Sequence, residues 1–110
     1  MDNSGNLPKI IHDMVQRIVE GVHPHQVILF GSHARGRAGL DSDVDLLVVT
    51  PIIGSKRKKT VDIYGLLAGV GLPKDVIVVT PQEVEKYRNI PGTLIRTAFR
   101  EGKLLYEHST

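Results

Sequence analysis

Two aspartates, Asp43 and Asp45, open an apolar segment that reads VDLLVVT from Val44 to Thr50. Residues two apart on a β-strand point to the same side of a sheet, so the two carboxylates are expected to project together, a few ångströms apart. Adjacent carboxylates repel each other unless a cation lies between them. Mg²⁺ suits this position, since it takes oxygen ligands, uses few protein carboxylates and keeps places for water and substrate phosphates. The pair therefore indicates phosphoryl or nucleotidyl transfer.

A Gly-Ser turn lies ten residues before the aspartate pair, directly after the apolar segment Gln26–Phe30. Gly31 has no side chain to block a phosphate, and Ser32 offers a hydroxyl and is placed to cap a short helix over residues 33–35. The amides at that helix start are expected to bind anionic oxygen, joined by the guanidinium of Arg35 on the same helical face. The turn is therefore a candidate cradle for a polyphosphate.

Each of these parts also has a plainer explanation. A lone Gly-Ser turn is usually a turn and helix cap, an Asp-x-Asp pair is often a solvated strand end, and a single arginine is surface charge. Their conjunction favours a site, because the turn follows a strand, a cap coincides with it, and two acids open an apolar strand. Together the parts are expected to bind a nucleoside triphosphate as its magnesium complex, with the α-phosphate near the aspartates.

The elements that would position these residues alternate between strand and helix patterns. Apolar residues recur at helical spacing in the first and third helical segments, and Thr80, Pro81 and Glu83 form a capping box with proline at the first helical position. Helices are expected at Pro8–Val22, 33–35, Thr60–Val70, from Pro81 through Tyr87 and at Thr93–Glu101, and strands at Gln26–Phe30, Val44–Thr50, Asp75–Thr80 and, at a sheet edge, Lys103–Glu107. The stretch Pro51–Lys59 is expected to be an exposed loop. The alternation predicts one α/β layered domain over residues 1–110.

The spacing of the motif resembles that of a known family. Gly-Ser, ten residues, Asp-x-Asp is similar to the signature of the nucleotidyltransferase superfamily that includes DNA polymerase beta. The wider stretch Gly31–Val49, GSHARGRAGLDSDVDLLVV, resembles its minimal nucleotidyltransferase (MNT) branch, whose members are small proteins, often antitoxins paired with a HEPN-domain toxin. The resemblance implies a nucleotidyltransferase fold, in which a small mixed β-sheet is flanked by helices.

The resemblance also implies a third carboxylate on a later strand, beside the first two. Asp75 opens the only later strongly apolar strand, DVIVVT, and is expected to complete the set, the alternative being a loop residue that caps its strand. Asp41 in the loop and Asp62 on a helix are weaker competitors. By the same resemblance Asp43, Asp45 and Asp75 coordinate two Mg²⁺ ions, and Asp75 helps to deprotonate an acceptor hydroxyl. The implied reaction transfers AMP from ATP, or the monophosphate of another nucleotide, and releases pyrophosphate.

Composition limits the protein classes that remain. The chain has 110 residues, 41% of them hydrophobic and 24% charged, which is typical of a globular protein with its own core. It has no cysteine, which excludes a disulfide scaffold and thiol chemistry. The N-terminus lacks a signal-peptide pattern and no apolar run is long enough to span a membrane, so a cytoplasmic protein without a membrane partner is expected. The net charge of +2 is too small to indicate nucleic acid, which is not excluded.

Three other polar segments have open assignments. The segment His23–His25 lacks a third metal ligand at a usual spacing and is expected to form a turn. His33 lies at a position that the family pattern leaves open, where it either touches substrate or faces solvent. The basic run Lys56–Lys59 is expected to be solvated, the alternative being that it attracts triphosphate, an acidic partner or RNA.

Three functions of different classes follow from this reading. The first is an antitoxin of a HEPN/MNT pair that adenylylates its helical partner. The second is a nucleotidyltransferase for a small molecule or an RNA end, which would need a separate acceptor-binding subunit because so short a chain has no room for one. The third is a noncatalytic module that neutralises its partner by contact. The intact Gly31, Ser32, Asp43 and Asp45 argue against the third.

Overall fold

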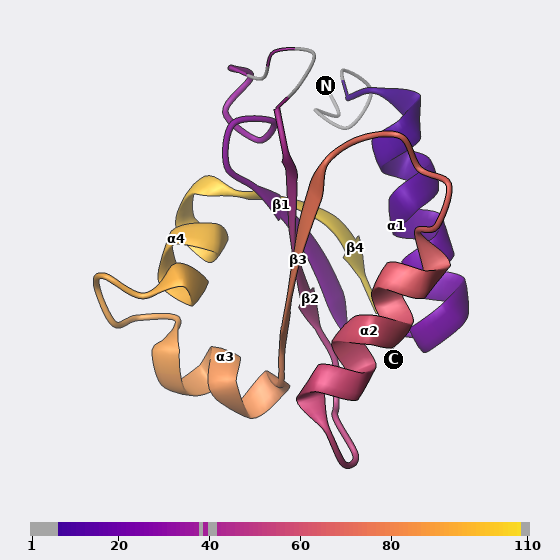
Figure 1. Cartoon of the computed structure of the whole chain (residues 1–110). Helices are drawn as coiled ribbons and strands as arrows, with labels where there is room; N and C mark the ends of the chain where they lie inside the picture. The colour runs from indigo at the N-terminus through magenta and orange to yellow at the C-terminus, as the bar shows by residue number, and fades with distance from the viewer. Residues whose placement is uncertain (1–6, 38, 40–41, 109–110) are drawn as a thin grey trace.

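The fold is a four-stranded mixed sheet with helices on both faces (Figure 1), as the computed structural model describes it for residues 7–37, 39 and 42–108. Along the chain the elements are α1 (Lys9–Val22), β1 (Gln26–Phe30), β2 (Val44–Val49), α2 (Lys56–Leu66), β3 (Lys74–Val79), α3 (Pro81–Tyr87), α4 (Leu94–Glu101) and β4 (Lys103–Glu107). The strand order is β3-β2-β1-β4, with β2 parallel to β3 and the other pairs antiparallel. The predicted mixed α/β architecture is confirmed.

Side-chain alternation along the strands divides the core into two clusters. Val44, Leu46 and Val48 of β2 are buried in the cluster that includes residues of α1 and α2, whereas Leu47 and Val49 are buried in the cluster that includes residues of α3 and α4. In Figure 1 the sheet is seen edge-on, with α1 and α2 on its right and α3 and α4 on its left. Because β2 is covered on both faces, it reads as a nearly continuous apolar run.

The helix α1 follows its predicted pattern closely. Its buried residues Ile11, Met14, Val15 and Ile18 recur at three- and four-residue intervals, which places them on one face of the helix. His23 ends the helix in the left-handed conformation, with φ of 49°, and its amide donates to the carbonyl of Val19. The chain then turns directly into β1.

The helix α2 begins earlier than predicted. The interpretation of Pro51–Lys59 as an exposed loop and of Thr60–Val70 as a helix is wrong at both boundaries, since α2 runs from Lys56 to Leu66. Ser55 starts it, because its side chain accepts a hydrogen bond from the backbone amide of Lys58 at 3.1 Å. Apolar periodicity missed this turn because its residues are basic, although the serine N-cap was a signal that could have located it.

Hydrogen bonds to α2 and to the segment that precedes β3 hold the start of this edge strand. Its backbone amide at Val76 donates to the hydroxyl of Tyr64 on α2 at 2.9 Å, and the ammonium of Lys74 donates to the carbonyls of Val70 and Leu72. An outward amide of an edge strand would otherwise lack a protein partner. These bonds fix the segment that carries Asp75.

The helices α3 and α4 cover the second face of the sheet, and β4 is the strand at its other edge. The predicted capping box is present at α3, where Thr80 and Glu83 exchange hydrogen bonds, and Thr93 caps α4. The predicted edge strand β4 pairs with β1, with a bulge opposite Val27 and Ile28. No helix in the described part of the chain is long and apolar enough to cross a membrane.

Candidate active site

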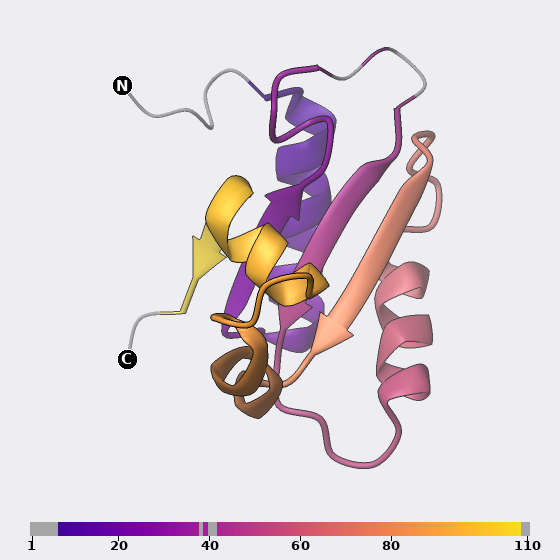
Figure 2. The ribbon, with the colours of Figure 1, turned by 90° about the vertical axis from the view of Figure 1, so that its left-hand side faces the viewer.

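One end of the sheet gathers the residues that the motif singled out. β1 ends there, and β2 and β3 begin there, at the top of Figure 2. In the parallel ladder Asp45 lies opposite Asp75, and in the antiparallel ladder Asp45 lies opposite Phe30, the residue before Gly31. Neighbouring strands are about 4.8 Å apart, so the aspartates of β2 and β3 are adjacent. The register thus brings the Gly-Ser turn and the expected third carboxylate to Asp45 from opposite sides.

The aspartates also share one face of the sheet. Asp45 is followed at two-residue spacing by Leu47, and Asp75 by Ile77, and both of these apolar side chains pack in the cluster under α3 and α4. Asp43, two residues before Asp45, precedes the strand and is exposed. We call Asp43, Asp45 and Asp75 the acidic cluster. It lies at the end of the face that α3 and α4 cover.

Gly31 lies in close contact with the acidic cluster. A Cβ atom at this position would collide with Oδ2 of Asp45, and the backbone of Gly31 has φ of +76°, a conformation that L-residues rarely adopt. The positive φ therefore disfavours other residues at this position, and a Cβ atom would in addition require the Asp45 side chain to move. The sequence predicted a glycine that leaves room for phosphate, and the structure adds that it leaves room for a carboxylate.

The segment after Gly31 is a compact hydrogen-bonded turn. The amides of Ala34 and Arg35 donate to the carbonyl of Gly31 at 3.1 and 3.2 Å, and that of Arg37 donates to the carbonyl of Ser32 at 2.9 Å. The predicted helix over residues 33–35 does not form, because Gly36, with φ of +70°, reverses the chain after a single turn. We call residues 31–37 the Gly-Ser turn. Its first amides lie beside the acidic cluster without the dipole of a regular helix.

The side chains of Arg35 and His33, both in the Gly-Ser turn, make contacts near the acidic cluster. Nη1 of Arg35 lies 3.9 Å from Oε1 of Glu101 at the end of α4, and both side chains are about half exposed. His33 bonds through Nε2 to the carbonyl oxygen of Ser42 at 3.1 Å. Arg35 is thus loosely paired and retains hydrogen-bond donors for an anion, whereas His33 is held within the protein.

The ionised form of Asp45 is disfavoured by its neighbours in the acidic cluster when no cation is bound. Burial raises the pKa of Asp45, and the negative charges of Asp75 and Asp43 raise it further, while His33 and Arg35 oppose the rise. The carboxylates of Asp43 and Asp75 are therefore close enough to disfavour the ionised form of Asp45. A bound cation would remove this repulsion.

The acidic cluster offers the donor atoms that Mg²⁺ takes. Its oxygens are hard ligands, and two or three carboxylates leave other positions for water and phosphate. Among the described residues, no group of three or more histidine, aspartate or glutamate side chains is placed so that it could hold a metal ion. A magnesium ion that uses few protein ligands and shares a phosphate does not need such a group.

Of the two competing acidic residues, the structure describes only Asp62, which does not join the cluster. Asp62 lies on α2, where its carboxylate is 3.6 Å from the ammonium of Lys58, and Asp41 lies outside the described residues. The basic run Lys56–Lys59 forms the first turn of α2 at the opposite end of the sheet (Figures 1 and 2), where Lys56 binds both carboxylate oxygens of Glu83 at 2.7 and 2.9 Å. This run therefore lies far from the acidic cluster.

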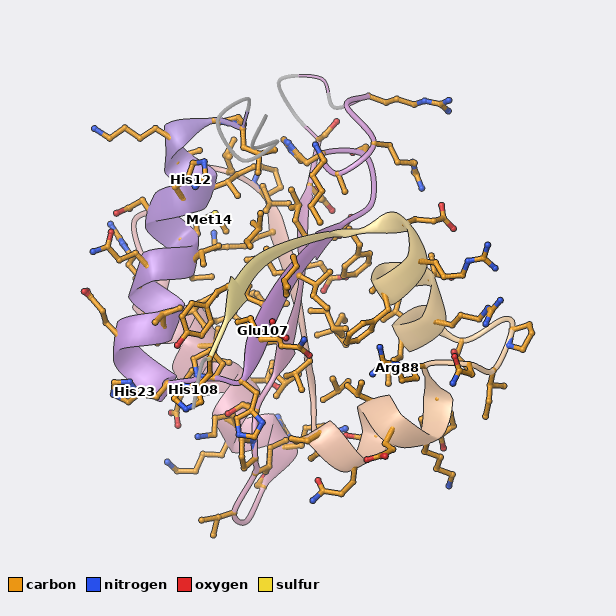
Figure 3. The ribbon with its side chains drawn as sticks, turned by 180° about the vertical axis from the view of Figure 1, so that it is seen from behind. His12, Met14, His23, Arg88, Glu107 and His108 are labelled. Atoms are coloured by element: carbon orange, nitrogen blue, oxygen red, sulfur yellow. The ribbon has the colours of Figure 1, made fainter. Side chains whose placement is uncertain are left out.

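A cavity on the described surface also lies away from the acidic cluster. It has a volume of about 410 Å³, and its lining includes His25, Gln26, Glu107 and His108, the last two labelled at the lower end of β4 in Figure 3. Gln26 donates to Glu107 at 2.9 Å, and the rings of His25 and His108 are stacked with centroids 6.3 Å apart. These groups satisfy one another, and we assign the candidate active site from strand register and charge instead of cavity size.

Comparison with known proteins agrees with the motif. A family model described as a nucleotidyltransferase domain matches residues 9–105. No curated protein matches the sequence. A solved structure of a candidate nucleotidyltransferase from Sulfolobus solfataricus superposes with a TM-score of 0.63 at 21% identity, covering 91% of this chain and 79% of that chain.

Two further structures are of toxin-antitoxin pairs. One, with AMP-PNP, gives a TM-score of 0.65 at 16% identity, and the other, a mutant of MntA-HpeT, gives 0.64 at 14% identity. Each covers 89% of this chain, and this chain covers 73% of each. At these identities the likeness shows a shared fold.

Proposed function

The chain belongs to the nucleotidyltransferase domain family, and from that premise we propose that it transfers AMP from ATP to an acceptor hydroxyl and releases pyrophosphate. The observation that carries the proposal is the parallel register that sets Asp75 beside Asp45, with Gly31 against the same carboxylate. A purely structural strand end has no need of three like charges, since their repulsion raises the free energy of the fold. A site that binds a divalent cation and a nucleotide phosphate does need these charges.

The roles of the residues follow from their positions. Asp43, Asp45 and Asp75 would hold one or two Mg²⁺ ions, which when bound neutralise charge on the phosphates and orient the reacting oxygens. The backbone amides of Ser32 and His33, at the start of the Gly-Ser turn, bind the β- and γ-phosphates together with the Ser32 hydroxyl and the Arg35 guanidinium. The α-phosphate then lies nearest the carboxylates.

The chemical step is an in-line displacement at the α-phosphorus. The acceptor oxygen forms a bond to that phosphorus while the bond to the bridging oxygen of pyrophosphate breaks. We assign to Asp75 the proton of the acceptor hydroxyl, because it is the exposed carboxylate at the edge of the sheet, where an acceptor can approach. The Gly-Ser turn holds the leaving pyrophosphate.

The acceptor is expected to be a second protein, specifically a helical HEPN-type toxin for which this chain is the antitoxin. Two proteins that share the fold are in toxin-antitoxin pairs, and one of those structures is described with AMP-PNP, which supports both a protein partner and an adenine nucleotide.

The test uses the purified chain, Mg²⁺, ATP labelled at the α-phosphate, and a HEPN-domain protein as the candidate acceptor. Wild type is expected to add one adenylyl group to the partner, detected by intact mass, and to release one pyrophosphate per group. The double variant Asp43→Ala with Asp45→Ala is expected to add none, while the matched control Asp62→Ala on α2 adds as much as wild type.

Other outcomes distinguish the alternatives. Label transfer to an RNA end or to a small hydroxyl compound, and none to the protein, would replace the acceptor and keep the reaction. Full neutralisation of the partner by the double variant, with no label transferred by wild type, would refute the reaction and leave a binding module.

A further inference from the structure

His33 is the side chain that directly joins the two halves of the candidate active site. It follows Ser32 of the Gly-Ser turn, and its Nε2 lies 3.1 Å from the carbonyl oxygen of Ser42, the residue before Asp43. One hydrogen bond therefore links the residue next to the phosphate-binding hydroxyl with the peptide that leads into the acidic cluster. The bond crosses nine positions of sequence and is partly shielded from water.

The hydrogen bond determines which nitrogen of the imidazole carries a hydrogen. A backbone carbonyl oxygen can only accept, so Nε2 must carry the hydrogen. The tautomer of the imidazole with hydrogen on Nε2 meets this requirement. The side chain acts here as a hydrogen-bond donor of fixed length.

The surrounding backbone shows what the bond restrains. On one side the Gly-Ser turn is closed by its own amide bonds, including Arg37 to Ser32 at 2.9 Å. On the other side Gly39 and Ser42 exchange bonds, with the Gly39 amide donating to Ser42 Oγ at 2.8 Å. Each small turn is internally bonded, and the imidazole of His33 connects them.

We propose that His33 is a positioning residue, which holds the phosphate-binding turn at a fixed distance from the start of β2 through its hydrogen bond to the Ser42 carbonyl. The inference rests on the proposed function, since the positioned groups are those assigned to triphosphate and metal. Holding the two groups before the nucleotide arrives lowers the entropy that binding must remove. Loss of the bond is expected to weaken nucleotide binding.

The experiment compares two variants of the full chain that differ only in hydrogen bonding. Glutamine and methionine have similar length and volume, but only the glutamine amide can donate to the Ser42 carbonyl. His33→Met is expected to raise the dissociation constant of the magnesium complex of AMP-PNP about fivefold, the factor for one net hydrogen bond, and His33→Gln is expected to restore it to within about twofold of wild type. His25→Met, at the opposite end of the sheet, is the matched control and should bind as wild type does.

A second measurement does not depend on nucleotide binding. Amide hydrogen exchange in the free protein is expected to quicken at Arg37 and Ser42 in His33→Met and to return to wild-type rates in His33→Gln. Unchanged exchange in the methionine variant would overturn the inference. Faster exchange with unchanged affinity would also overturn it, because the bond would then exist without positioning the site.

The two proposals fail in different ways. If wild type does not bind the magnesium complex of AMP-PNP, the proposed function fails, and exchange rates alone decide whether His33 restrains the two turns. If wild type binds it and His33→Met binds equally well, the role of His33 fails and the proposed function stands.

Discussion

Replacing Asp45 by asparagine should stabilise the protein when magnesium is absent and destabilise it, relative to wild type, when magnesium is present. The substitution keeps the shape of the side chain and removes its charge. Asp45 is partly buried and faces Asp75 across one strand spacing, with Asp43 beside it, and its pKa is raised for those reasons. The charge that the substitution removes is therefore one that the metal-free fold disfavours.

The size of the effect follows from the strand spacing. Two unit charges about 5 Å apart interact by about 0.8 kcal/mol at the dielectric constant of water and by about 3 kcal/mol at an effective value of 20. Asp75 is exposed, so solvent screening places the repulsion near the lower figure, and we expect Asp45→Asn to gain about 1 kcal/mol without metal. Mg²⁺ at ten times its dissociation constant stabilises wild type by about 1.4 kcal/mol, which reverses the order.

The assay is urea unfolding at neutral pH, with EDTA and then with Mg²⁺. The control is Asp62→Asn, which removes an equally charged group that is paired with Lys58 at 3.6 Å and is expected to lose a few tenths of a kcal/mol in both conditions. If Asp45→Asn is no more stable than wild type in EDTA, the claim of mutual repulsion is wrong. If Mg²⁺ stabilises both equally, Asp45 is not a ligand.

The pH dependence of unfolding provides a second test of the repulsion at Asp45. Because the pKa of Asp45 is raised in the folded state, its ionised form costs stability above that pKa, and the cost disappears as the pH falls through it. The advantage of Asp45→Asn in EDTA should therefore shrink on acidification. An advantage that grew as the pH fell would contradict the assigned cause.

Three further substitutions test other parts of the account. Gly31→Ala should destabilise the fold by about 1–2 kcal/mol, from its positive φ and its collision with Asp45, and should abolish binding of magnesium nucleotide in calorimetry. Glu83→Gln keeps the helix cap but loses the ion pair with Lys56, so it should cost about 0.5 kcal/mol at pH 7. Since that pairing lowers the pKa of Glu83 from 4.5, the difference should fade as the pH falls through the lowered value, which acid unfolding will show. Tyr64→Phe removes the hydroxyl oxygen that accepts a hydrogen bond from the backbone amide of Val76. It should speed hydrogen exchange of that amide and lower the free energy of unfolding by about 1 kcal/mol.

The acidic pair and its turn were predictable from sequence because their meaning depends on local periodicity. Strand alternation predicted that Asp43 and Asp45 share a face, although Asp43 lies just before β2, and a glycine after an apolar strand predicts a turn. Asp75 was different, since its place depends on β3 lying parallel to β2 in the register that pairs it with Asp45. No local pattern encodes that register, and the family resemblance supplied it.

The misplaced boundaries share a physical cause. The first turn of α2 carries Lys56–Lys59, whose charge hides it from any search for apolar spacing, and its start depends on a side-chain cap at Ser55. The turn over residues 33–35 has helical composition but is stopped by Gly36, whose positive φ is visible only in the structure. The bond from His33 to Ser42 depends on how two loops approach each other, which sequence spacing does not report.

The central claim is that Asp43, Asp45 and Asp75 form one site for a divalent cation beside the Gly-Ser turn. The most direct test is a titration of the full chain with Mn²⁺, which takes similar oxygen ligands to Mg²⁺, followed by paramagnetic broadening of backbone amide signals in NMR spectra. The account predicts that signals near the acidic cluster and Gly31 broaden first, and that excess Mg²⁺ restores them. Broadening that begins at His25 and His108 at the other end of the sheet, or that survives Asp43→Asn with Asp45→Asn, would contradict it.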